Sequence, residues 1–399
     1  MRASIQPAPK RVGPHVEPSP LLDPGGAHVV LGSSPVVAEL TAPIAPTERS
    51  MFAPRGVCVA LDGSVWVADT GHHRVLGWPT LPENDGEPAS VLLGQPSFRD
   101  EGRNAGGSAH AATFNVPTGI AGCAGGLVLA DAWNHRVLIW LETPRCSNKP
   151  PDLVLGQEDF RSVDGNRGKD APAADTLFWP FGVAWDGARL WVADTGNRRV
   201  LMWHGMPDRC GRSADLVLGQ NDFTCRDENA GGCAGAASMR WPHAIAFLGD
   251  CLCVADAGNS RVMVWRSLPR RNGQPCEAVL GQQTWHAADH NQGEYWPGPA
   301  SVNMPYGVAA IEGSLLVADT ANSRVIGWPA DSIRESGAPA RRLSGQPDWQ
   351  SKGENRWRTA ERDSLCWPFA MAVAGRNCLI ADAGNNRVLV WHCHAGVPL

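Results

Sequence analysis

The segment LWVADTGNRRVLMW, Leu190 to Trp203, is the strongest indication of the fold, because five near copies of it occur elsewhere in the chain. The copies are VWVADTGHHRVLGW (Val65 to Trp78), LVLADAWNHRVLIW (Leu127 to Trp140), LCVADAGNSRVMVW (Leu252 to Trp265), LLVADTANSRVIGW (Leu315 to Trp328) and LIADAGNNRVLVW (Leu379 to Trp391). Their shared aspartates recur every 62 or 63 residues, at Asp69, Asp131, Asp194, Asp256, Asp319 and Asp382. A fixed period of short strand-forming units is typical of a repeat architecture, because one unit cannot bury its own apolar faces.

Each unit predicts four short antiparallel strands. An opening proline leads into an apolar run such as Gly182 to Trp185, and a small-residue turn leads into a second run that ends in Ala-Asp. Arg-Val-Leu-Xaa-Trp is the third run, and Val-Leu-Gly-Gln is the fourth. Strands of this length, enriched in β-branched and aromatic residues and separated by Gly and Pro turns, indicate a propeller blade.

The chain has six third strands, but the fourth strand of the last unit is missing after Trp391. A matching segment, Val29 to Gly32, lies near the N-terminus, with Gly32 62 residues before Gly94. We therefore predict an all-β fold, a six-bladed β-propeller with four antiparallel strands per blade, closed by an N-terminal outer strand that removes an exposed edge. The predicted organisation is a disordered lead-in over 1–28, a single propeller over 29–392 and a C-terminal tail over 393–399.

The repeated signature resembles that of the NHL-repeat family, whose units carry Asp-Xaa-Xaa-Asn-Xaa-Arg-Val. Asp194 to Val200 and Asp382 to Val388 match it closely, and the resemblance covers residues 29–392. The first copy departs from it, with His72 at the asparagine position. The units are also longer than the usual family unit, as in a bacterial, long-repeat variant. The resemblance implies the fold strongly and an activity weakly, because one fold hosts many functions.

Composition favours a cytoplasmic globular protein. Apolar residues make up 43% of the chain and charged residues 19%, and no apolar stretch approaches the roughly 20 residues that span a membrane. The N-terminal segment is rich in proline and does not read as a secretory signal. The twelve cysteines are therefore expected to be mostly reduced.

Nucleic acid is not the expected partner. The formal net charge is −5, and the basic pairs Arg270-Arg271 and Arg341-Arg342 are short and lie in loops. Phosphate binding needs a clustered positive surface. The resemblance alone points the other way, since some NHL propellers bind RNA.

The recurring charged residues are predicted to be structural. An arginine follows each shared aspartate by five residues, at Arg74, Arg136, Arg199, Arg261, Arg324 and Arg387. Aspartate suits turns through local backbone hydrogen bonds, and the arginine can pair with it. A residue that is present in every copy is expected to support the packing of the blades, because packing is the one task that all copies share. Replacing Asp194 by Ala is expected to cost about 1–3 kcal/mol.

Function is better sought where the copies differ. The long crossings from each fourth strand to the next first strand open on the same face as the second-to-third-strand turns. They carry aromatic residues, including Trp179, Trp241 and Trp367 just before the opening proline. The residues that follow the opening prolines are predicted to surround the mouth of the central channel: Arg55, Thr118, Phe181, His243, Tyr306 and Phe369. Long loops of this kind are often functional.

Three interpretations of these residues stay open. The aromatic side chains pack the loops, or they form a face that binds a protein or a small ligand, or they border a metal-assisted active site. The first strands are poor in metal ligands, so a metal would have to use loop residues. The weak candidates are Cys225, Cys233, His243, His286 and His290. Cys225 and Cys233 do not have the spacing of a tight metal knuckle.

We predict a non-catalytic binding or scaffold propeller with no cofactor, whose partner, a protein above all, docks on the long-loop aromatic face. One alternative is a metal-dependent lyase or lactonase-like hydrolase with a divalent metal at the channel mouth, as in some relatives. Another alternative, implied by the resemblance alone, is an accessory protein of a metalloenzyme such as an uptake hydrogenase. The sequence favours binding over catalysis and names no partner.

Overall fold

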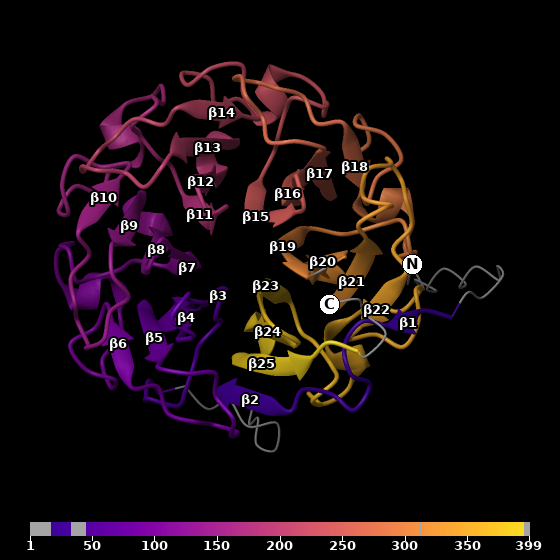
Figure 1. Ribbon diagram of the computed structural model, residues 1–399, viewed down its shortest axis with the longest axis horizontal. Coiled ribbons are helices and arrows are strands. Elements are labelled where there is room, and N and C mark those ends of the chain that lie inside the picture. Colours follow the sequence, from indigo (N-terminus) through magenta and orange to yellow (C-terminus); the bar gives the residue numbers. More distant parts are fainter. Residues whose placement is uncertain (1–16, 33–44, 312, 395–399) are drawn as a thin grey trace, which may run out of the picture.

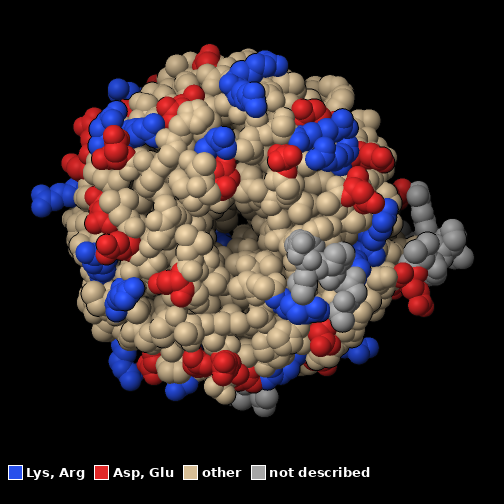
Figure 2. Space-filling model, viewed as in Figure 1, with Lys and Arg blue, Asp and Glu red and all other residues tan. Residues whose placement is uncertain are grey.

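Six four-stranded blades form a closed ring in the computed structural model, which describes residues 17–32, 45–311 and 313–394 (Figure 1). The predicted all-β, six-bladed architecture is therefore confirmed. No helix among these residues is long and apolar enough to cross a membrane. Basic and acidic residues are interspersed along the rim of the face in Figure 2, and uncharged residues surround much of its central hollow.

The strands run outward from the centre in chain order in blades 1 to 5, and in blade 6 the N-terminal strand β2 takes the outermost place. Blades 1 to 3 consist of β3 (Gly56–Val59), β4 (Val65–Asp69), β5 (Arg74–Trp78) and β6 (Val91–Leu93); β7 (Pro117–Cys123), β8 (Gly126–Asp131), β9 (Arg136–Trp140) and β10 (Leu153–Leu155); and β11 (Pro180–Trp185), β12 (Arg189–Asp194), β13 (Arg199–His204) and β14 (Leu216–Leu218). Blades 4 to 6 consist of β15 (Pro242–Leu248), β16 (Cys251–Asp256), β17 (Arg261–Trp265) and β18 (Ala278–Leu280); β19 (Pro305–Ile311), β20 (Ser314–Asp319), β21 (Arg324–Pro329) and β22 (Arg342–Ser344); and β23 (Pro368–Ala374), β24 (Asn377–Asp382), β25 (Arg387–His392) and β2 (Val29–Gly32).

Short 3₁₀ turns connect the strands on one face of the ring. Those between the second and third strands are η1 (Thr70–His72), η3 (Ala132–Asn134), η5 (Thr195–Asn197), η7 (Ala257–Asn259), η9 (Thr320–Asn322) and η11 (Ala383–Asn385). Those within the crossings between blades are η2 (Arg103–Gly106), η4 (Gly165–Gly168), η6 (Glu228–Gly231), η8 (His290–Gly293) and η10 (Glu354–Trp357).

The innermost strands pack closely around the channel, and this closeness requires small residues. A Cβ added to Gly56 would lie 1.9 Å from the carbonyl oxygen of Thr118 in the next blade, and one added to Gly182 would lie 2.1 Å from that of His243. Only a residue without a side chain allows the backbones to approach so far. The glycine after the channel-mouth residue therefore sets how tightly these neighbouring blades converge.

The N-terminal strand closes the ring as predicted. β2 pairs antiparallel with β25, with Val29 opposite Val390 and Gly32 opposite Arg387. Val29, Val30 and Leu31 are buried at 0 to 2% exposure, so the strand also completes the apolar core of blade 6. The first and last segments of the fold are thereby held in one sheet.

The predicted disordered lead-in over 1–28 needs correction for its described part, residues 17–28. β1 (Ser19–Pro20) pairs in parallel with β22, and Leu21 and Leu22 are fully buried beside blades 5 and 6. The carbonyl of Asp23 accepts a hydrogen bond of 2.7 Å from the indole of Trp391. Two adjacent leucines gain hydrophobic stabilisation by filling this space, which explains the order. Residues 1–16 lie outside the described residues.

The C-terminal boundary also differs from the predicted tail over 393–399. Cys393 is 3% exposed and pairs with Leu22 through an isolated antiparallel bridge. The propeller therefore extends at least to Cys393, because that side chain belongs to the same apolar cluster as Leu22. Residues 395–399 lie outside the described residues.

The recurring aspartate and arginine form a buried pair in every blade, shown here for blade 3. Oδ2 of Asp194 accepts hydrogen bonds of 2.8 Å from Nε of Arg199 and 2.8 Å from Nδ2 of Asn197. The guanidinium also donates to carbonyl groups of the crossings before and after the blade, at Thr176 and Phe223. Both charged side chains are 0% exposed. The pair thus fastens two loops to one blade, which is a structural role.

Candidate functional site

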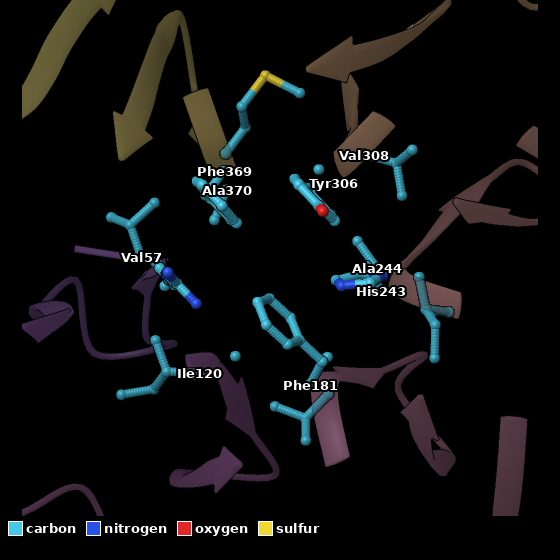
Figure 3. Close-up of a pocket in the computed structure, with 17 residues that line it drawn as sticks. Val57, Ile120, Phe181, His243, Ala244, Tyr306, Val308, Phe369 and Ala370 are labelled. Atoms are coloured by element: carbon cyan, nitrogen blue, oxygen red, sulfur yellow. The ribbon is translucent and has the colours of Figure 1, made fainter. Parts of the chain in front are cut away.

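The predicted channel-mouth residues do gather at one end of the channel (Figure 3). The ring centroids of Phe181 and His243 are 4.4 Å apart, those of His243 and Tyr306 4.3 Å, and those of Tyr306 and Phe369 4.6 Å. The guanidinium carbon of Arg55 lies 4.8 Å from the centroid of the Phe369 ring. These four rings and the arginine form a continuous aromatic cluster from five different blades.

Thr118, the sixth of these residues, does not take part in the cluster. Its side chain is 0% exposed, and its hydroxyl donates a hydrogen bond of 2.9 Å to the carbonyl of Phe181. Thr118 therefore joins blades 2 and 3 at the mouth.

The channel next to the aromatic cluster is narrow. Its volume is about 90 Å³, and Val57, Ile120, Val308 and Met371 line it along with backbone atoms of the first strands. Figure 3 shows the aromatic rings converging within it from β11, β15, β19 and β23. The first strands carry no metal-ligating side chain into this space apart from His243, as their sequence predicts.

A larger cavity opens beside the cluster on the face that carries the crossings. Its volume is about 380 Å³, and it borders blades 2, 3 and 4. We call it the tryptophan cavity, because Trp133, Trp179 and Trp241 line it. Their exposed fractions are 58%, 47% and 36%, so large aromatic surfaces remain open to a ligand.

Trp367, which was predicted to join this group, lies elsewhere on the same face. It is 49% exposed, and its indole donates a hydrogen bond of 3.1 Å to a carboxylate oxygen of Glu354. The sixfold repeat places it in blade 6, so it does not line the tryptophan cavity. Phe181, His243, Tyr306 and Arg55 do line the cavity, so these members of the aromatic cluster form its inner wall.

Two cavity residues, Trp133 and Arg198, escaped the sequence analysis, although the aligned repeats contain the signal. At the position of Trp133 the other five turns have glycine or alanine, namely Gly71, Gly196, Gly258, Ala321 and Gly384. At the position of Arg198 the other blades have side chains that can accept a hydrogen bond, namely His73, His135, Ser260, Ser323 and Asn386. At each of these two positions, one blade alone departs from the type of residue that the other five blades share.

Local packing explains why a tryptophan fits in blade 2. In blade 3 a Cβ on Gly196 would lie 2.2 Å from the ring of Phe178, so a side chain cannot enter there. Blade 2 has Asn115 at the position of Phe178, and this smaller residue leaves room for the indole of Trp133. Trp133 in turn lines the cavity.

Arg198 interrupts a seam of hydrogen bonds between neighbouring blades. Nδ1 of His135 accepts a hydrogen bond of 3.0 Å from the backbone N–H of Trp179, and Asn386 accepts the equivalent bond from Ala53. A guanidinium has no lone pair to accept such a bond. The N–H of Trp241 therefore donates to Asp256 instead, at 3.1 Å.

The altered hydrogen bond changes the backbone at Trp241. The five other residues before the opening prolines have left-handed φ values between 47° and 55°, at Ala53, Val116, Trp179, Met304 and Trp367. Trp241 is absent from this left-handed set. The seam between blades 3 and 4 thus differs from the others where the cavity opens.

Burial keeps the imidazole of His243 neutral. It lowers the pKa of His243 to about 4, while Nδ1 donates a hydrogen bond of 2.8 Å to the carbonyl of Trp241. Burial also raises the pKa of Tyr306 and lowers the pKa of the Arg55 guanidinium. Near neutral pH the inner wall of the cavity therefore carries positive charge at arginine and none at His243 or Tyr306.

The weak metal candidates do not come together. Nδ1 of His286 donates to the carbonyl of Ala234 at 2.9 Å, and Nδ1 of His290 lies 2.8 Å from the hydroxyl of Ser260. His243 belongs to the channel mouth instead. Across residues 17–32, 45–311 and 313–394, no three His, Cys, Asp or Glu side chains form a group suited to a metal ion.

The seam gives the protein a predicted dependence of stability on pH. Burial lowers the pKa of His135 from 6.5 to about 4, so the unfolded chain binds this proton first as the pH falls. Stability should therefore decrease between those two pH values. We expect His135→Asn to weaken the dependence, because Asn386 shows that asparagine accepts the same hydrogen bond without titrating.

Melting temperatures of the wild type and His135→Asn, measured across this pH range, check the expectation. The variant should keep part of the dependence, because burial also lowers the pKa of His243 to about 4. Identical curves for the two proteins would contradict the assignment of His135 as a neutral acceptor.

Comparison with known proteins places the fold in a class. The profile of the NHL repeat matches residues 53–78. NHL repeat-containing protein 2 of Gallus gallus is 26% identical over 236 residues, which are 54% of this chain and 30% of that protein. The chain thus spans less than a third of the length of that relative. Together with the six-bladed ring, these matches confirm the predicted resemblance to the NHL-repeat family.

Two solved structures align with most of this chain at low identity. Hydrazine synthase of Kuenenia stuttgartiensis aligns with 88% of this chain and 97% of its own, at a TM-score of 0.51 and 12% identity. The WD40 β-propeller domain of Doa1 aligns with 96% of this chain and 95% of its own, at a TM-score of 0.44 and 8% identity. At such identities the likeness concerns the fold alone.

Proposed function

We propose that this propeller is a binding protein that recognises a partner protein or a small ligand through the tryptophan cavity. The observation that carries the proposal is the exposure of three tryptophans, Trp133, Trp179 and Trp241, around one cavity of about 380 Å³. Small-ligand pockets typically measure roughly 300–1,000 Å³. Tryptophan is also among the residues that dominate binding energy at protein interfaces.

The contrast with the structural tryptophans supports this assignment. The six tryptophans that end the third strands are at most 2% exposed, and each indole donates to a backbone carbonyl. Loop packing, the competing interpretation, would predict similar burial for the cavity tryptophans. Instead, more than a third of each remains accessible. Accessible, rigid aromatic surface is what a recognition site requires, because little conformational entropy is lost on binding.

Substitutions in the aromatic cluster are less suited to a test of binding than substitutions of the cavity tryptophans. Phe181, His243 and Tyr306 pack against one another, so their removal would also lower stability. Trp179 and Trp241 are more exposed and can be replaced with less effect on the core. Substitutions of these two tryptophans therefore allow an effect on binding to be distinguished from an effect on stability.

The experiment compares capture of partners from the source cells by the wild type and by Trp179→Ala with Trp241→Ala. We expect the double variant to lose partners that the wild type retains, by about 2 kcal/mol or more in binding free energy, while its melting temperature changes little. Leu141→Ala, which removes an exposed leucine outside the cavity, is the matched control. Unchanged affinity together with lowered stability would instead favour loop packing.

The cytoplasmic location and the non-catalytic character predicted from the sequence remain part of this proposal. Cys225, Cys233, His286 and His290 are not among the residues that line the channel mouth, so a metal-dependent lyase or hydrolase would need other ligands there. Elemental analysis of the purified protein tests that alternative, because it predicts about one tightly bound divalent metal per chain.

A further inference from the structure

Two arginines line the tryptophan cavity without a carboxylate partner among the described residues. Nε of Arg55 and Nε of Arg198 are buried and have no hydrogen-bond acceptor. The contrast with the six arginines of the repeated pairs is direct, since each of those binds a buried aspartate, as Arg199 binds Asp194. A guanidinium stays charged in proteins and is costly to desolvate without a counter-charge.

The described walls of the tryptophan cavity carry no carboxylate, because the residues that line it include neither Asp nor Glu. Burial lowers the pKa of Arg55, and the opposing electrostatic influence comes from Tyr306 rather than from a carboxylate. Because His243 and Tyr306 are neutral near pH 7, the cavity presents two uncompensated positive charges.

Three departures from the repeat meet in this one cavity. Trp133 replaces a small turn residue, Arg198 replaces a hydrogen-bond acceptor, and Arg55 is the cation among the six channel-mouth residues. They come from blades 2, 3 and 1 and lie far apart in the sequence. Packing does not require them, because the other blades pack without them. Their convergence combines aromatic walls with positive charge.

We infer that the tryptophan cavity binds an anionic aromatic group, namely a carboxylate joined to a planar ring. The carboxylate would accept charge-assisted hydrogen bonds from Arg55 and Arg198, and the ring would stack on the tryptophan rim. This inference rests on the proposed function, since it names the ligand chemistry of the same site. Two sources supply that chemistry: a free aromatic carboxylate, or the C-terminal aromatic residue of a protein.

Calorimetric titration of the full chain tests the inference with matched probes. Indole-3-acetate and its neutral amide form one pair, and a short peptide ending in tryptophan, with a free or an amidated carboxyl group, forms the other. We expect the acid of at least one pair to bind the wild type about tenfold or more tightly than its amide. The pair that shows the difference identifies the source of the ligand.

Substitutions of Arg55 and Arg198 then test whether these two residues bind the carboxylate. Arg198→Ser introduces the residue that blades 4 and 5 carry at this position, and Arg55→Gln keeps a polar side chain but removes its charge. Each should weaken binding of the acid about tenfold and leave binding of the amide within about twofold. Arg271→Gln, at an exposed arginine outside the cavity, is the control and should change neither.

The outcomes separate this inference from the proposed function. Equal binding of acid and amide in both pairs, or no binding of any probe to the wild type, would overturn the inference. So would arginine variants that bind the acid like the wild type. The proposed function would still stand if the tryptophan double variant lost its captured partner, and it would fail if that partner were retained.

Discussion

Deletion of residues 1–34 is expected to prevent folding or to remove most of the free energy of unfolding. The deleted segment contains β2, which forms the outer strand of blade 6, and Leu21 and Leu22, which are fully buried. Burying an aliphatic side chain stabilises a protein by roughly 1.5–3 kcal/mol. The segment buries five of them, the two leucines and Val29, Val30 and Leu31 of β2, and their combined contribution is comparable to the whole free energy of unfolding of a domain, about 5–15 kcal/mol. The deletion would also expose the edge of β25 to pairing with other chains.

Circular dichroism, thermal unfolding and light scattering measure these effects. Leu21→Ala with Leu22→Ala should give an intermediate loss, of several kcal/mol, because it creates a cavity and leaves β2 in place. Pro24→Ala changes an exposed residue of the same segment and should be nearly neutral. A deleted protein that melts like the wild type would show that the N-terminal strand does not close the ring.

Asp194→Ala is expected to destabilise the protein by about 3–5 kcal/mol, because it leaves Arg199 buried without its counter-charge. This exceeds the 1–3 kcal/mol expected from the sequence, which could not show that both side chains are 0% exposed. The substitution also removes the acceptor for the backbone N–H of Phe178, at 2.7 Å. Chemical denaturation compared with the wild type measures the difference.

A double variant and an exposed control complete this test. Asp194→Ala with Arg199→Met should be more stable than Asp194→Ala alone, since no charge then remains buried. Asp208→Ala removes the carboxylate of an exposed ion pair with Arg209 and should stay within about 0.5 kcal/mol of the wild type. If Asp194→Ala kept wild-type stability but lost partner binding, the repeated aspartates would be functional rather than structural.

The repeat period allowed the fold to be predicted in detail. Each unit encodes its own strands locally, and the displaced copy Val29 to Gly32 revealed the closure. The lead-in was harder to predict, because Leu21 and Leu22 are ordered by blades 5 and 6, which come more than 280 residues later. A segment rich in proline carries no local sign that distant strands will bury two of its leucines.

The candidate site could be predicted in part. Propeller symmetry correctly brought Phe181, His243, Tyr306 and Phe369 to one end of the channel, because register alone fixes the start of each first strand. The same symmetry could not show that Thr118 turns its hydroxyl to a neighbouring blade, or that Trp367 lies apart from Trp179 and Trp241. Trp133 and Arg198 were missed because each belongs to a segment otherwise devoted to packing.

The amino-acid sequence was sufficient to predict the number of blades, the order of their strands, the closing strand and the residues at the channel mouth. These follow from periodicity, because what recurs in every unit must serve the packing of every unit. Which exceptions to the repeat lie together is visible only in the folded protein. Trp133, Arg198 and Arg55 are separated along the chain, and the ring brings them to one cavity because its blades converge on a common axis. Charge and exposure at that cavity are properties of the assembled ring, so no single repeat could reveal them.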